Sequence, residues 1–196
     1  MTIGFAPQTT TRISSRLDRS LEPAEWTAAG IPLLANPREV VKDLCSRHVP
    51  TPVTAVVAVL APEGRLVASA SFTSSTGIVD GWEHRNAILA HLRRVVPHDL
   101  RRRTPARTAV LLLCRGGTPG WTKEDGAWMW GLRDACGLHG LRCGAYVTLT
   151  RDGWQVLGEN RSGRTPNSGQ LSGRPGGAAT PHPQGAPESL RRTAAR

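Results

Sequence analysis

The most constraining feature of this chain is a continuous apolar run over residues 108–114, which contains the uninterrupted string Val110-Leu111-Leu112-Leu113. An apolar run of strand length without alternation is typical of a strand that is buried on both faces of a sheet. We therefore expect residues 108–114 to form a central strand of an α/β domain.

Helix and hairpin signals flank this strand on both sides. Asn36-Pro37 begins a helix over residues 36–47, because Asn is a good N-cap and Pro suits the first helical position. The other expected segments are a β-hairpin (54–61 and 65–72), a helix (83–96), a capped helix (122–140) and a second β-hairpin (145–150 and 154–157). The sequence thus predicts an α/β (α+β) fold with a mixed sheet and three helices.

Both ends of the chain differ from this middle part in composition. Residues 1–35 show no sustained periodicity, so we interpret them as a flexible N-terminal arm with at most one short turn at 23–29. Residues 160–196 are rich in Ser, Gly, Pro and Arg, which cannot bury enough apolar surface to order a segment. The predicted organisation is an arm (1–35), one domain (36–159) and a disordered basic tail (160–196).

The charge of the chain favours a polyanionic partner. The formal net charge is +10, and residues 160–196 contribute six Arg against one Glu. Clustered Arg gains free energy from counterion release on nucleic acid. A solvated tail that only aids solubility is the alternative interpretation.

A second group of arginines lies around the end of the predicted helix 83–96. Their guanidinium groups suit phosphate, because the planar fork can donate two hydrogen bonds at once. We predict a nucleic-acid contact at Arg93, Arg94, Arg101, Arg102, Arg103 and Arg107. The alternatives are a solvated loop or a docking surface for an acidic protein.

The sequence also bears on the compartment. It contains no apolar run of membrane-spanning length and no apolar core of a secretory signal, so we expect a cytoplasmic protein without membrane contact. Four cysteines without an export signal indicate reduced thiols. Lys42 and Lys123 are the only lysines, and this bias toward Arg, with abundant Ala, Gly and Pro, is typical of a bacterial chain with GC-rich coding.

The loop between the central strand and the next helix carries a recognisable spacing. Leu112, Cys114, Thr122 and Asp125 match, without a gap, the positions of a loop of the form H-x-H-x(7)-S-x-x-D. With this loop and the order of its elements, the segment 36–159 resembles the JAB/MPN domain of the DNA repair protein RadC family. The downstream Leu138-His139-Gly140-Leu141-Arg142 and Asp152-Gly153-Trp154 are similar to segments of that family.

The resemblance implies a JAB/MPN (cytidine-deaminase-like) fold and a zinc peptidase site. In that family two imidazoles and a carboxylate hold Zn²⁺, an upstream Glu is the general base, and the Ser stabilises the oxyanion. Here Leu112 cannot ligate a metal, and the strand 65–72 offers no carboxylate. We therefore expect a vestigial loop with no catalytic residue, metal or cofactor, in which Cys114 is a small buried apolar residue and Thr122 and Asp125 cap a helix.

Three functional hypotheses follow. The first is a non-catalytic, regulatory RadC-like pseudoenzyme that contacts DNA or RNA through its Arg-rich loop and tail while the domain binds a protein partner. The alternative is a zinc metallo-isopeptidase with altered ligands, in which Cys114 and Asp125 bind the metal. The third is a mobile-element or developmental regulator that acts through protein contacts only.

Two further patterns are weaker. Cys136, His139 and Cys143 have a spacing that would place three soft ligands near one helical face, although Gly140 should end the helix first. Trp128 and Trp130 lie two residues apart on a helix and must face different directions. One of the two tryptophans is therefore expected to be partly exposed and to be the better candidate for an interaction.

Overall fold

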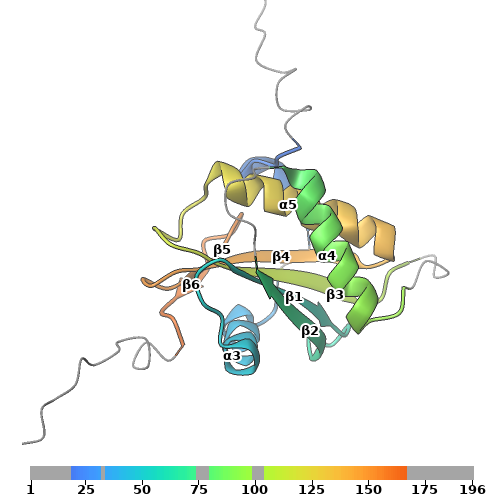
Figure 1. Cartoon of the computed structure of the whole chain (residues 1–196), viewed down its shortest axis with the longest axis horizontal. Coiled ribbons are helices and arrows are strands. Elements are labelled where there is room, and N and C mark those ends of the chain that lie inside the picture. Colours follow the sequence, from blue (N-terminus) through green and yellow to red (C-terminus); the bar gives the residue numbers. More distant parts are fainter. Residues whose placement is uncertain (1–18, 32–33, 74–79, 99–103, 167–196) are drawn as a thin grey trace, which may run out of the picture.

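The computed structural model describes residues 19–31, 34–73, 80–98 and 104–166. These residues form a six-stranded mixed sheet in the order β2-β1-β3-β4-β5-β6 (Figure 1). The strands are β1 (Thr54–Leu60), β2 (Leu66–Thr73), β3 (Thr108–Cys114), β4 (Arg142–Leu149), β5 (Trp154–Val156) and β6 (Ser162–Gly163). The helices in the same ranges are α2 (Pro23–Ala28), α3 (Pro37–His48), α4 (Gly81–Val95) and α5 (Lys123–His139).

The predicted central strand is confirmed. β3 pairs antiparallel with β1 and parallel with β4, and its residues from Ala109 onward are buried. Leu111 and Leu113 pack in the cluster beneath α4 and α5, whereas Leu112 and Cys114 pack in the cluster beneath α3. Helices therefore cover both faces of the sheet, as a strand without polar alternation requires.

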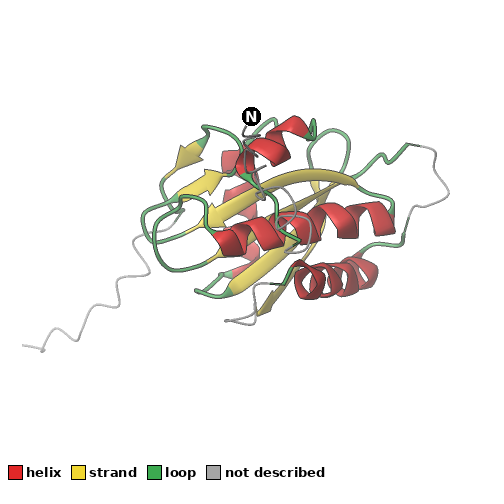
Figure 2. Ribbon diagram, turned by 90° about the horizontal axis from the view of Figure 1, so that it is seen from above, coloured by secondary structure: helices red, strands yellow, loops and turns green. Residues whose placement is uncertain are grey.

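The helices α4 and α5 lie side by side on one face of the sheet, and α3 lies on the other (Figures 1 and 2). The two helices pack closely at Gly131 of α5. A Cβ atom at this position would lie 2.8 Å from the backbone nitrogen of Arg85 and 3.1 Å from the carbonyl oxygen of Gly81. Glycine is thus the residue that allows this helix crossing.

Local sequence signals set the bounds of both helices. The Asp80 side chain accepts a hydrogen bond from the backbone N–H of Trp82 at 2.9 Å and so caps α4. Thr122 and Asp125 form a reciprocal capping box at the start of α5. The helix α5 ends at Gly140, whose φ of 76° is the left-handed conformation that glycine adopts without strain.

The packed region extends beyond the predicted domain at both ends. A fourth helix, α2, lies in the predicted arm, where Leu21 and Trp26 are only 8% and 4% exposed. Trp26 packs against Gly158, far along the chain, so no local periodicity could indicate its burial. Past residue 159, the strand β6 and the buried Thr165 continue the fold. Residues 1–18 of the predicted arm and 167–196 of the predicted tail lie outside the described residues.

Two smaller expectations can be compared with the structure. All four cysteines are free thiols, as expected. Within the described ranges, no helix has both the length and the apolar character needed to cross a membrane.

Candidate functional site

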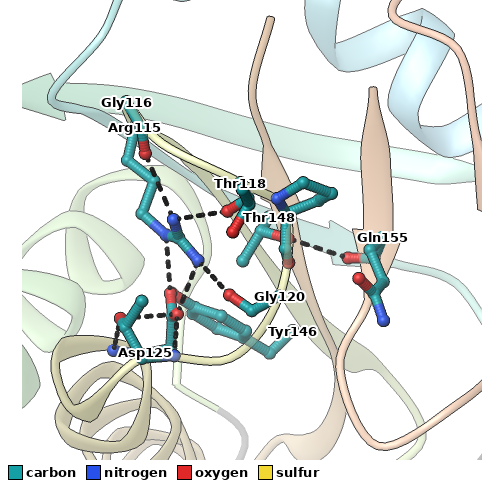
Figure 3. A network of polar contacts seen from close by, with 10 residues as sticks. Arg115, Gly116, Thr118, Gly120, Asp125, Tyr146, Thr148 and Gln155 are labelled. Atoms are coloured by element: carbon teal, nitrogen blue, oxygen red, sulfur yellow. Dashed lines mark hydrogen bonds and ion pairs between the residues drawn. The ribbon is translucent and has the colours of Figure 1, made fainter. Parts of the chain in front are cut away.

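The loop that carries the RadC-like spacing ends in a buried ion pair between Arg115 and Asp125 (Figure 3). Asp125 is 0% exposed and Arg115 is 12% exposed. The Arg115 guanidinium donates two hydrogen bonds to the carboxylate, Nε to Oδ1 at 3.1 Å and Nη2 to Oδ2 at 2.8 Å. This fork-to-fork geometry is the strongest arrangement of an arginine and a carboxylate.

Three further donors complete the surroundings of Asp125. The Thr122 backbone N–H and hydroxyl donate to Oδ2 at 2.8 Å and 2.7 Å. The Tyr146 hydroxyl donates to Oδ1 at 2.8 Å. Burial raises the pKa of Tyr146 well above its ordinary value, and the charge of Asp125 raises it further. The phenol is therefore a protonated donor, and both carboxylate oxygens of Asp125 already accept hydrogen bonds.

Arg115 also ties down the loop itself. Its guanidinium donates to the carbonyl oxygens of Thr118 at 2.8 Å and Gly120 at 2.6 Å. The Thr148 hydroxyl of β4 donates to the Pro119 carbonyl at 2.8 Å. One arginine thus joins the loop, the first turn of α5 and the sheet into a single polar network (Figure 3).

This network does not fit a zinc site. Cys114 packs in the cluster beneath α3, with its Sγ 3.9 Å from the Pro50 carbonyl oxygen, and burial raises the pKa of its thiol. Asp125 instead contacts Tyr146, which belongs to the cluster beneath α4 and α5. The two ligands of the isopeptidase alternative are therefore not brought together, and Leu112 contributes no ligand atom.

The Cys136, His139 and Cys143 pattern does not form a metal site in the described residues either. No group of three His, Cys, Asp or Glu side chains that could hold a metal occurs there. Cys136 and His139 are buried in the fold, and Cys143 lies on β4. A hydrogen bond with Cys143, together with burial, raises the pKa of Cys136 well above its ordinary value, so this thiol is protonated.

Three of the six arginines of the predicted nucleic-acid contact lie in the described residues. Arg93 and Arg94 are exposed in the last turn of α4, and Arg107 immediately precedes β3. Arg101, Arg102 and Arg103 lie outside the described residues. The first residue of β4, Arg142, joins this surface, since its backbone N–H donates to the Arg107 carbonyl at 2.9 Å. We call Arg93, Arg94, Arg107 and Arg142 the basic end.

The topology explains why Arg107 and Arg142 lie together, and Arg93 lies within electrostatic reach of His139, three residues before Arg142. The parallel strands β3 and β4 start at the same end of the sheet, where Thr108 is paired with Arg142. The turn between β1 and β2 reaches the same end, because Leu60 is paired with Thr108. Its acid Glu63 lies 3.5 Å from Arg65, so the turn adds no net charge. Sequence reasoning missed Arg142 because parallel pairing of distant strands leaves no local signal.

The positive field of the basic end acts on its neighbours. Burial lowers the pKa of His139 at the end of α5, backbone hydrogen bonds oppose part of this effect, and the nearby Arg93 lowers the pKa further. Arg93 therefore lies within electrostatic reach of His139.

The tryptophans are divided as expected. Trp128 is buried and stacks on His84, with 3.8 Å between ring centroids. Trp130 is partly exposed and lines a shallow groove of about 410 Å³ with Leu21, Arg133, Asp134, Gly137 and Leu138. Trp130 is the tryptophan of this pair that a ligand can reach.

No protein-family model, curated protein or solved structure matches this chain. Fold and site together define an α+β domain with a six-stranded mixed sheet, a sealed polar loop after its central strand and a basic end.

Proposed function

We propose that this protein is a non-catalytic domain of RadC-like descent that binds nucleic-acid phosphates at its basic end. The observation that carries the proposal is the gathering of Arg93, Arg94, Arg107 and Arg142 where β3 and β4 begin. The RadC-like part is supported by element order: α3, the β1–β2 hairpin, α4, β3, α5 and the β4–β5 hairpin follow the order that the resemblance implies.

The non-catalytic part follows from the polar network. A catalytic metal needs ligands with free lone pairs and an open coordination position. Both oxygens of Asp125 accept hydrogen bonds from Arg115, Thr122 and Tyr146. The strand β2, where the general base of the resembled family would lie, carries no carboxylate. We therefore assign this loop a structural role.

The phosphate-binding part follows from the chemistry of arginine. An exposed guanidinium stays charged at all physiological pH values and matches two phosphate oxygens with two donors. The side chains of Arg93 and Arg94 point from the end of a helix into solvent. Contacts of this kind bind any sequence and lose affinity as salt concentration rises.

The test is a fluorescence-anisotropy titration of labelled DNA and RNA, single- and double-stranded, at several salt concentrations. We expect log K to fall linearly with log salt concentration. The variant Arg93→Ala/Arg94→Ala should reduce the slope on duplex DNA by about 1.8, because each lost phosphate contact contributes about 0.9. The full-length chain is used throughout, so any contribution of the tail is common to all variants.

A matched control is Arg151→Ala/Arg164→Ala. Both residues are exposed, and both lie at the opposite end of the sheet, beyond the pairing of Leu149 with Cys114. This variant removes the same charge but should leave the slope almost unchanged. Absence of salt-dependent binding, or equal effects of the two variants, would refute the proposal. Binding of polyglutamate without binding of nucleic acid would favour an acidic protein partner instead.

A further inference from the structure

Within the described residues, the strand β2 forms one edge of the sheet and lacks the usual protection of an edge. In the described residues it pairs with β1 alone. Its sequence, Leu-Val-Ala-Ser-Ala-Ser-Phe-Thr, contains no charged residue and no proline. Natural edge strands commonly carry such residues or are very short, because an open row of N–H and C=O groups pairs readily with another strand.

The opposite edge of the sheet shows this protection. There β5 has three residues and β6 has two. Gly163 of β6 packs closely on the Trp154 ring, because a Cβ atom at position 163 would lie 2.7 Å from a carbon of that ring. The next residue, Arg164, is exposed. The same sheet thus has one shortened edge next to a charge and one long, neutral edge.

The geometry of β2 suits the approach of another strand. Its register with β1 is continuous from Ala68, opposite Val59, to Thr73, opposite Thr54, and the only irregularity lies at the hairpin end. The central residues Ala68, Ser69, Ala70 and Ser71 are small. Another strand can therefore approach this part of β2 to the spacing of paired strands, which is roughly 4.7–4.9 Å.

Apolar and aromatic surface continues to this edge on both faces. On the α4 side, Phe72 stacks on His91 with 4.2 Å between ring centroids, and both residues are partly exposed. On the α3 side, Val67 is 45% exposed, and Ser69 hydrogen-bonds to His48 at 2.8 Å. A strand added at this edge would cover Phe72 and Val67 as well as the backbone groups.

We propose that β2 pairs antiparallel with β2 of a second copy of this chain, so that two six-stranded sheets join across a two-fold axis. We choose a second copy as the partner of this edge because the neutral strand sets no like charges against each other when it pairs with itself. At other parts of the surface, two copies of a chain with net charge +10 repel each other.

The position of the basic end specifies the antiparallel direction. The strand β2 begins beside Leu60, at the end of the sheet that holds Arg107 and Arg142. Antiparallel pairing sets the start of one β2 beside the end of the other. The two basic ends then point in opposite directions, whereas parallel pairing would place them next to each other. Repulsion between the copies is lowest in the antiparallel arrangement.

The test is the mass of the nuclease-treated full chain by sedimentation velocity over a range of concentrations at high salt. We expect a reversible dimer. Val67→Lys/Ser71→Lys places two ammonium groups of each copy beside the shared edge and should raise the dimer Kd at least tenfold. The matched control is Leu138→Lys/Ser162→Lys, an exposed apolar residue on α5 and an exposed serine on β6. It adds the same charge and should leave the Kd within about twofold.

Hydrogen exchange of the β2 amides gives a second measurement on the unaltered chain. Protection should rise with protein concentration for β2 and stay constant for β3, which is paired on both sides within one chain. A monomer at all concentrations, a dimer that the β2 variant leaves intact, or a dimer weakened equally by the control variant would each overturn the proposal.

Discussion

Arg115 in the loop after β3 and Asp125 in the first turn of α5, ten residues further on, form a bidentate ion pair with N–O distances of 3.1 Å and 2.8 Å. The pair closes the loop between β3 and α5. In this chain the charge of the buried carboxylate is balanced by a guanidinium on the same loop. The loop can therefore keep its path, its helix cap and its buried acid without any ligand.

The first prediction concerns the stability that depends on Asp125. Asp125→Asn keeps the shape but turns one acceptor into a donor that faces other donors, and it leaves Arg115 without an opposite charge. Breaking a buried ion pair costs about 3–5 kcal/mol. We expect the loss of unfolding free energy to lie near the lower end of this range, because the Arg115 side chain is 12% exposed. Urea unfolding followed by tryptophan fluorescence measures the free energy of unfolding.

The control for this prediction is Asp134→Asn. Asp134 pairs with Arg85 at 3.2 Å but is 39% exposed. Exposed ion pairs contribute about 0–1 kcal/mol. Equal losses in the two variants would show that the loop network has no special structural role.

A second prediction concerns metal content. Because the oxygens of Asp125 are engaged and Cys114 belongs to the other core cluster, we expect purified protein exposed to Zn²⁺ and then dialysed to retain much less than one equivalent. Elemental analysis measures this ratio, and melting temperature with and without zinc gives an independent readout. One equivalent of zinc that disappears in Asp125→Asn would instead support the isopeptidase with altered ligands.

The parts of this fold that the sequence predicts well are those with local causes. An unbroken apolar run identifies β3, and a capping box with a terminal glycine identifies α5. The missed parts depend on long-range packing. Trp26 is buried against Gly158, and Arg142 reaches the basic end only because β4 pairs parallel with β3.

The candidate site shows the same division. The spacing of Thr122 and Asp125 predicts a helix cap, and the structure has it. The same spacing says nothing of Arg115, because a loop arginine has no periodicity that would indicate its target. Tyr146 approaches Asp125 only once β4 is placed beside β3. The helix cap at the end of this loop could thus be predicted from the sequence, but the internal salt bridge that closes the loop could not.

A third prediction compares two glycines of α5. Gly131→Ala should destabilise the fold by about 1–3 kcal/mol, because the new methyl group would lie 2.8 Å from the Arg85 backbone nitrogen. Gly137→Ala meets no atom within 4 Å and should stabilise the helix by up to about 1 kcal/mol. Thermal unfolding should therefore shift in opposite directions. The same sign for both variants would contradict the close crossing of α4 and α5.

The last prediction concerns His84, whose ring is 2% exposed and stacks on Trp128. Burial lowers the pKa of His84 from 6.5 to about 4, and the nearby Asp80 opposes part of this effect. Between these two values the unfolded chain binds a proton that the folded chain does not. The contribution of His84 to stability is therefore complete above pH 6.5 and is lost as pH falls toward 4. The difference corresponds to about 3 kcal/mol at most.

His84→Phe tests this dependence. Phenylalanine keeps a ring against Trp128, and no described residue accepts or donates a hydrogen bond at His84 Nε2, so the substitution removes no partner there. The free energy of unfolding of His84→Phe should decline less between pH 6.5 and 4 than that of the unaltered protein. His48 and His139, whose pKa values burial also lowers, remain titratable and retain part of the decline. The comparison is with His98→Gln, which replaces an exposed histidine. If the pH profile of His84→Phe is the same as that of the unaltered protein, His84 is not buried as a neutral ring between α4 and α5.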